Sequence, residues 1–194
     1  MGRKHRHWAR LLPEDHPRYY FAYGSNLDVV QMQKRCPTSF PVAPCSLPDA
    51  RLVFSGVLTV ETYKGLEVPG ALYTVEPTDI VALDRYEGYP HLYEKKYTWG
   101  VVDGKRVRVF YYTLNHPYSE YPPTDLYYET VVAGYGDWRL PMSVLRASRK
   151  HAFRAQRDSE RRHLEELYKQ PAFGEDDDLD ERWYQRLDNV IEYE

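Results

Sequence analysis

The sequence predicts an α+β fold, in which strands mix with short helices and at least one strand pair is antiparallel. Residues 93–102 and 105–114 are apolar and aromatic runs joined by Asp103-Gly104, the strongest short-range signal for a β-hairpin. A helix is indicated between Pro77, which suits a first turn, and Gly88, which suits a helix end. A chain of 194 residues is long enough for one such domain and an appendage.

The first element expected is a short strand at residues 19–23, followed by a turn and a helix at residues 27–35. Ser25 or Asn26 is expected to cap this helix by accepting a hydrogen bond from a free backbone N–H group. Gly24 allows a backbone conformation that other residues resist, and it leaves room for a ligand. The turn therefore offers N–H groups that suit an anion, although a purely structural turn is the alternative.

Prolines and glycines divide the rest of the chain. The proline-rich residues 37–48 are expected to form a loop, and residues 51–54 a strand. Residues 68–75 begin with a Pro-Gly turn and continue as a strand. After the hairpin, Thr124 is expected to cap a helix that Gly134 closes.

The two ends of the chain differ in composition from the middle. We expect residues 1–18 to be a basic N-terminal arm, residues 19–148 the folded domain, and residues 149–194 a helical and acidic extension. A helix that Pro141 opens is expected to run to about residue 169.

Composition argues against several classes of partner. The net charge is −3, and no apolar run approaches the ~20 residues of a membrane span, so neither nucleic acid nor a membrane is expected. The basic residues 146–162 are expected to be a solvated helix face. The apolar stripe around Trp183 is expected to dock on this protein or on a partner, such as a second copy. The basic start lacks the apolar core of a signal peptide, so a cytoplasmic location is expected.

Neither a metal nor a cofactor is expected. Cys36 and Cys45 are the only cysteines, and the seven histidines lack metal-binding spacing. A disulfide between the two cysteines is geometrically possible, but a cytoplasmic location favours free thiols.

Six stretches occur in a distinctive order. They are Tyr-Gly-Ser-Asn-Leu at 23–27, Leu-Asp-Arg-Tyr-Glu-Gly at 83–88, Tyr93, Val-Phe-Tyr-Tyr at 109–112, Pro-Pro-Thr-Asp-Leu-Tyr at 122–127, and Gly136 through Leu-Pro at 140–141. In its order, and closely in its spacing, this set of stretches resembles the motifs of the γ-glutamylcyclotransferase-like (AIG2-like) family. The resemblance covers about two-thirds of the chain.

The resemblance implies a small, partly closed β-barrel flanked by short helices, with a pocket at one mouth. It also implies a cofactor-independent enzyme that converts a γ-glutamyl amino acid or amine to 5-oxoproline, with Glu87 as general acid/base. The substrate-binding residues that it implies are Tyr23, Gly24, Ser25, Asn26, Tyr112 and Tyr127. The Glu-Gly segment followed by Tyr93 is closer to the branch that acts on γ-glutamyl amino acids than to the glutathione-specific branch.

The implied reaction has modest chemical needs. A γ-glutamyl compound carries its own nucleophile, because the α-amine can attack the γ-carbonyl and close a five-membered lactam. Holding the folded conformer lowers the barrier by on the order of 7–11 kcal/mol. The enzyme must then bind the α-carboxylate, stabilise the oxyanion, and supply one carboxyl group of raised pKa to move protons.

Glu87 is the candidate for this carboxyl group. It lies at a predicted helix C-terminus, where the helix dipole disfavours a carboxylate. Tyr86, Tyr89 and Tyr93 are expected to exclude water from it and so raise its pKa. Asp84, one helical turn earlier, is the rival, and the residues alone do not rank the two.

Two other functions stay open. One is the cyclisation of a γ-glutamylamine, an isopeptide cross-link or a γ-glutamyl-protected metabolite. The other is a non-catalytic module that senses a small carboxylate or binds a partner. The walls of the pocket that contact the leaving group are expected to come from the loops at residues 37–48 and 116–123 and from the C-terminal extension.

Overall fold

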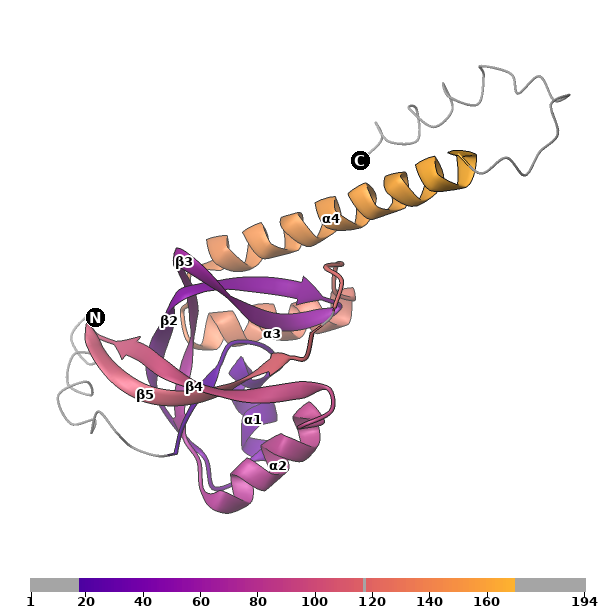
Figure 1. The fold of residues 1–194 in the computed structure, drawn as a ribbon. Helices are drawn as coiled ribbons and strands as arrows, with labels where there is room; N and C mark the ends of the chain where they lie inside the picture. Colours follow the sequence, from indigo (N-terminus) through magenta and orange to yellow (C-terminus); the bar gives the residue numbers. More distant parts are fainter. Residues whose placement is uncertain (1–17, 117, 170–194) are drawn as a thin grey trace, which may run out of the picture. The chain divides into compact units, whose positions relative to one another are not determined.

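The computed structural model describes residues 18–116 and 118–169, and it confirms the α+β class. Within these residues, five strands form a closed barrel in the order β1-β3-β2-β4-β5 (Figure 1). The strands are β1 Tyr19–Ala22, β2 Phe40–Ser55, β3 Val57–Thr74, β4 Tyr93–Val102 and β5 Lys105–Leu114. The helices are the 3₁₀ helix η2 Ser25–Leu27, α1 Val29–Arg35, α2 Pro77–Glu87, α3 Asp125–Asp137 and α4 Met142–Lys169.

The barrel has two wide antiparallel pairs, β2–β3 and β4–β5, a shorter antiparallel pair, β1–β3, and two narrow seams. Strand β5 meets β1 in parallel at Tyr20 and Phe110, and β2 meets β4 at Ser46 and Val101. The barrel that we expected to be partly closed is therefore closed, with each seam resting on one residue pair. The buried core draws on all five strands, including Phe21, Phe54, Leu72, Val102 and Val109.

The loop expected at residues 37–48 is wrong, because most of it is the first half of β2. Two features of the strand accommodate its prolines. The register with β3 shifts after Pro41 and again after Pro48, as at β-bulges. The other edge of β2 pairs with β4 only at Ser46. Most N–H groups on that edge therefore form no hydrogen bond to a strand, so a proline, which lacks the N–H group, costs no such bond there. The strand expected at residues 51–54 lies in the second half of β2.

The turn expected at Pro69-Gly70 is also wrong, since both residues lie inside β3. A Cβ on Gly70 would overlap the carbonyl oxygen of Ala22 and lie 2.6 Å from the ring of Phe21. Close packing against β1, rather than a turn, therefore requires this glycine.

Several local predictions are confirmed. The β4–β5 hairpin turns at Asp103 and Gly104, which both have the positive φ of a type I′ turn. Helix α2 ends at Gly88 in the left-handed conformation. Thr124 caps α3 by accepting a hydrogen bond from the N–H of Tyr127. Helix α4 follows Pro141, as predicted, and is helical up to Lys169, the last described residue.

The cap predicted for the first helix is wrong. Ser25 and Asn26 form the 3₁₀ helix η2, and α1 begins only after it. The N-cap of α1 is Asp28, whose side chain accepts a hydrogen bond of 3.0 Å from the N–H of Gln31. The polar side chains of Ser25 and Asn26 are therefore free for other contacts.

Gly134 does not end α3, which continues to Asp137. A Cβ at this position would lie 2.5 Å from Cβ of Leu27 and 2.8 Å from the backbone nitrogen of Asp28. The glycine therefore lets α3 pack directly on η2, which fixes the turn between β1 and α1 from behind.

The described part of α4 extends from the first of two structural units, residues 1–157, into the second, which begins at Asp158. The predictions for the N-terminal arm up to residue 17, for the acidic run at residues 175–178 and for the stripe around Trp183 lie outside the described residues. The boundaries proposed for the domains stay predictions. None of the described helices is long and apolar enough to cross a membrane. Cys36 and Cys45 are buried free thiols.

Candidate active site

The structure brings every predicted site residue to one pocket of about 240 Å³. The turn after β1 and the end of α2 form two of its sides, and β3, β4, β5 and α3 supply the others. The lining residues are Tyr20, Tyr23, Gly24, Ser25, Asn26, Val57, Leu58, Tyr86, Glu87, Leu92, Tyr93, Tyr112 and Tyr127. Aromatic rings therefore surround a single ionisable carboxyl group.

Asn26 connects the turn to that carboxyl group. Its side-chain nitrogen donates a hydrogen bond of 2.9 Å to Oε1 of Glu87 and one of 2.8 Å to the hydroxyl of Tyr20. Its side-chain oxygen accepts a hydrogen bond from the guanidinium of Arg35. The buried amide thus has partners on both its nitrogen and its oxygen.

Burial raises the pKa of Glu87 from its ordinary value of 4.5 to about 7. The charge of Arg35 and the hydrogen bond from Asn26 oppose this rise. Of the three tyrosines expected to exclude water, Tyr86 and Tyr93 line the pocket. The third, Tyr89, lies outside the pocket lining.

Asp84, the rival carboxyl group, lies outside the pocket lining and has two partners of its own. It accepts a hydrogen bond of 2.5 Å from the hydroxyl of Tyr112 and forms an ion pair of 2.8 Å with Lys95. These contacts hold Tyr112 against α2, and they engage the carboxylate of Asp84 with Tyr112 and Lys95. The geometry therefore favours Glu87 for proton transfer.

The tyrosine hydroxyls of the pocket differ in what they can still donate. Tyr23 donates to the backbone oxygen of Tyr112 at 2.6 Å, and Tyr93 donates to that of Leu58 at 3.1 Å. Tyr127 instead accepts a hydrogen bond of 3.0 Å from the N–H of Leu58. Its own hydrogen has no acceptor among the described residues, and burial raises its pKa, so it stays protonated. Tyr127 is thus free to donate to a ligand.

The turn after β1 also retains donors. Within the described part of the chain, the backbone N–H groups of Ser25 and Asn26 make no hydrogen bond, as the first residues of a 3₁₀ helix commonly do not. The side chain of Ser25 lies 3.1 Å from the hydroxyl of Tyr86. A Cβ on Gly24 would lie 3.2 Å from the hydroxyl of Tyr127, so a larger residue would crowd this donor.

Sequence reasoning missed several lining residues. Val57 and Leu58 escaped because the β2–β3 hairpin, which turns at Gly56, was not predicted. Arg35, which does not line the pocket but contacts Asn26, was also missed, because a contact between two elements leaves no local pattern in the sequence. Tyr20 was predicted only as part of an apolar strand and not as a pocket residue. Leu92 was missed as well and lies in the short turn between α2 and β4.

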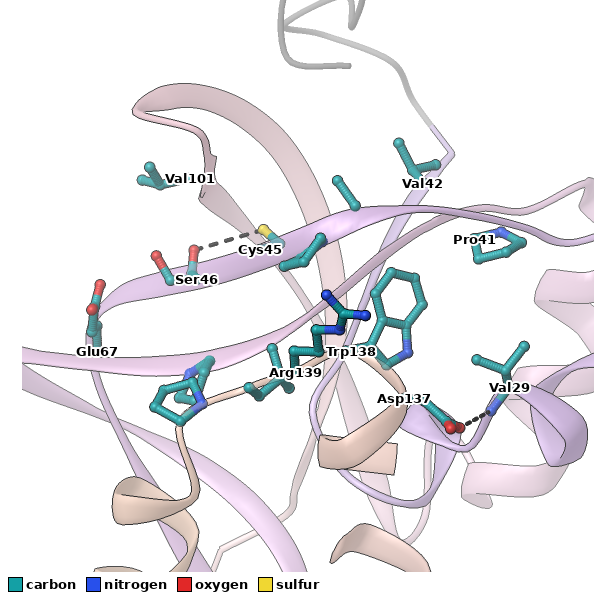
Figure 2. Close-up of a pocket in the computed structure, with 15 residues that line it drawn as sticks. Val29, Pro41, Val42, Cys45, Ser46, Glu67, Val101, Asp137, Trp138 and Arg139 are labelled. Carbon is teal, nitrogen blue, oxygen red and sulfur yellow. Dashed lines mark hydrogen bonds between the residues drawn. The ribbon is translucent and has the colours of Figure 1, made fainter. Parts of the chain in front are cut away.

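Two of the three segments expected to contact the leaving group do not line this pocket. The segment at residues 37–48 lines a separate cavity of about 830 Å³. Trp138 and Arg139 line the same cavity, as Figure 2 shows. The segment at residues 116–123 supports the β2–β3 turn, because the N–H of Gly56 donates to the backbone oxygen of Tyr121 at 3.1 Å. It reaches the pocket only indirectly.

Comparison with known proteins identifies the family of this chain. Residues 20–140 match the family model for "Gamma-glutamyl cyclotransferase, AIG2-like". A γ-glutamylcyclotransferase from Bos taurus is 26% identical over 137 residues, covering 63% of this chain and 72% of the bovine protein.

Solved structures share the fold. One described as a γ-glutamyl cyclotransferase matches with a TM-score of 0.61 at 20% identity, covering 89% of this chain and 98% of that one. An uncharacterized protein from Homo sapiens gives the same TM-score and identity, with 91% and 98% covered. Since the family model spans more than half of the sequence, this chain belongs to the γ-glutamyl cyclotransferase, AIG2-like, family.

Proposed function

We propose that this protein is a γ-glutamylcyclotransferase, which converts a γ-glutamyl amino acid or amine to 5-oxoproline and releases the free amine. The observation that carries the proposal is the position of Glu87. Its carboxyl group has a pKa raised to about 7 and is hydrogen-bonded to the turn that matches the family signature. A carboxyl group with this pKa can both accept and donate a proton near neutral pH.

The proton balance of the reaction suits one such group. The α-ammonium first gives a proton to the Glu87 carboxylate, and the neutral amine attacks the γ-carbonyl carbon. This attack forms the lactam C–N bond and a tetrahedral intermediate. Collapse of the intermediate re-forms the carbonyl group and breaks the bond to the leaving nitrogen. Overall, the α-nitrogen loses two protons and the leaving nitrogen gains two, so Glu87 needs only to move protons between them.

The remaining roles follow from the donors that the pocket retains. The free N–H groups of Ser25 and Asn26 suit the α-carboxylate of the glutamyl head group. The free hydroxyl hydrogen of Tyr127 suits the oxyanion, since its partner Leu58 orients it from behind. The rings of Tyr23 and Tyr112 act as walls, because their hydroxyls are already bonded.

The second candidate is a γ-glutamylamine substrate, whose leaving group carries no carboxylate. Glu87 is the only charged side chain among the described residues that line the pocket. Three of the lining side chains, Val57, Leu58 and Leu92, are aliphatic, and Leu92 is 57% exposed. Such a surface favours a leaving amine with an apolar substituent.

Isotope labelling tests the proposed reaction directly. The wild-type protein is incubated with γ-glutamyl dipeptides and γ-glutamylamines in H₂¹⁸O, and the products are identified by mass spectrometry. We expect equal amounts of unlabelled 5-oxoproline and free amine, because no water enters an intramolecular cyclisation. An α-N-acetylated substrate should be inert, since its nucleophile is blocked. Labelled glutamate would show hydrolysis instead, and binding without any product would favour the sensing module.

A further inference from the structure

Arg35, the last residue of α1, contacts the site from outside the pocket lining. Its guanidinium donates to the side-chain oxygen of Asn26 and lies 3.3 Å from the ring centroid of Tyr86. Tyr86 is the neighbour of Glu87, and its hydroxyl lies 3.1 Å from Oγ of Ser25. One cation therefore touches both the turn after β1 and the end of α2.

The contact with Asn26 fixes the direction of an amide. A side-chain amide can rotate by half a turn, which exchanges its oxygen and its nitrogen. In the rotated state the oxygen of Asn26 would face the carboxylate oxygen of Glu87, and both atoms are acceptors. A guanidinium has donors and no acceptor, so Arg35 can bind only the oxygen of the amide. Its presence therefore directs the amide nitrogen toward Glu87.

We propose that Arg35 is a positioning residue for the cyclisation, a role that rests on the proposed function. It locks the Asn26 amide with the nitrogen toward Glu87, and it holds Tyr86 by stacking on its ring. Its charge also counteracts the burial of the carboxylate, which keeps part of Glu87 ionised at neutral pH. Arg35 touches no reacting atom and acts through its two neighbours.

The other titratable groups around Glu87 do not supply this charge. The groups that interact electrostatically with Glu87 come from β1 and the turn after it, the end of α1, β4, β5 and α3. They are Tyr20, Tyr23, Cys36, Tyr93, Tyr112 and Tyr127. All six are neutral acids whose pKa is raised. The nearby ion pair of Asp84 with Lys95 neutralises itself. Among these groups, Arg35 is the cation that favours the carboxylate.

A titration without substrate tests the proposal. The ¹³Cδ resonance of Glu87, assigned by its loss in Glu87→Gln, is followed against pH in the wild type, Arg35→Met and Arg35→Lys. The matched control is Lys34→Met, which removes an exposed cation from the same helix end. We expect Arg35→Met to raise the midpoint by about one unit, and the control to match the wild type. An unchanged midpoint in Arg35→Met would overturn the proposal. Should that variant fail to fold, Arg35→Gln replaces it.

Kinetics separate the charge from the positioning. In Arg35→Met the acid limb of the kcat profile should move upward with the titration, which lowers activity at pH 7 by about fivefold for a one-unit shift. Arg35→Lys keeps the charge but loses the planar stack, so kcat should fall without a shift of the acid limb. Equal losses at all pH values in both variants would indicate a structural role only. A wild type that makes no 5-oxoproline would refute the proposed function, while the titration would still judge Arg35.

Discussion

The side-chain amide of Asn26 donates a hydrogen bond of 2.9 Å to the carboxyl group of Glu87, which lies 61 positions later in the chain. This bond joins the turn after β1 to the end of α2 and makes one site of two distant motifs. Burial and this bond act on the carboxyl group in opposite directions, and burial prevails. The site therefore holds a carboxyl group that is destabilised when ionised.

Glu87→Gln should make the fold more stable at alkaline pH. The folded-state pKa of about 7 lies above the ordinary value of 4.5, so the favourable contribution of neutral Glu87 is present below pH 4.5 and lost as pH rises through 7. The variant stays neutral and should gain about 1–3 kcal/mol over the wild type at pH 8, and little at pH 4.5. Urea unfolding at both pH values measures this difference. A gain that is equal at the two pH values would contradict the raised pKa.

Asp84→Asn should reduce stability more than it reduces chemistry. The substitution weakens the hydrogen bond from Tyr112 and leaves Lys95, which is 12% exposed, without its ion pair. We expect a loss of about 1–3 kcal/mol in unfolding free energy, less than for a fully buried pair. Activity at saturating substrate should fall far less than in Glu87→Gln. A folded Asp84→Asn protein as inactive as Glu87→Gln would make Asp84 the proton-transfer group.

Tyr127→Phe and Tyr93→Phe form a matched pair, because both hydroxyls bond the backbone of Leu58. Each change should destabilise the fold by about 1–3 kcal/mol, since it leaves a buried backbone group unpaired. Of these two hydroxyls, only that of Tyr127 has a hydrogen left for a ligand among the described residues, so only its loss should lower kcat, by about 10²-fold. Parallel thermal unfolding and steady-state kinetics compare them. Equal kcat values in the two variants would remove Tyr127 from the oxyanion site.

Gly134→Ala should separate α3 from η2. Its new Cβ would meet Leu27 and Asp28 at distances that demand movement, and we expect a loss of about 1–3 kcal/mol. Gly136→Ala, two residues later in the same helix, meets nothing within 4 Å and should stabilise α3 by about 0.5–1 kcal/mol. Circular dichroism melts of both variants measure the contrast. Similar melts would show that α3 does not rest on η2 through Gly134.

Local signals predicted much of the fold. The Asp103-Gly104 hairpin, the Gly88 end of α2 and the Thr124 cap all depend on residues close in the chain, and all are confirmed. The same holds for Glu87, whose place at a helix end is visible in the sequence. The family resemblance added the barrel, which no local pattern specifies.

The wrong predictions for Gly70, Gly134 and residues 37–48 share a physical cause, which is contact between separate elements, whereas the wrong cap of α1 is a local error. Gly70 and Gly134 resemble turn and helix-end residues, but each makes room for another element. The prolines of β2 are typical of a loop in the sequence. The strand tolerates them because it contains bulges and because one of its edges is almost unpaired. The contact of Arg35 with Asn26 likewise exists only once α1 has folded back beside the turn.

The most direct test of the central claim compares wild type and Glu87→Gln in 5-oxoproline release from the same γ-glutamyl substrate. Calorimetry and thermal unfolding run in parallel show whether the variant still binds that substrate and folds. The account predicts that the wild type releases 5-oxoproline and that the variant binds with about the same affinity but loses about 10³-fold or more in turnover. Full turnover by the folded variant would contradict it.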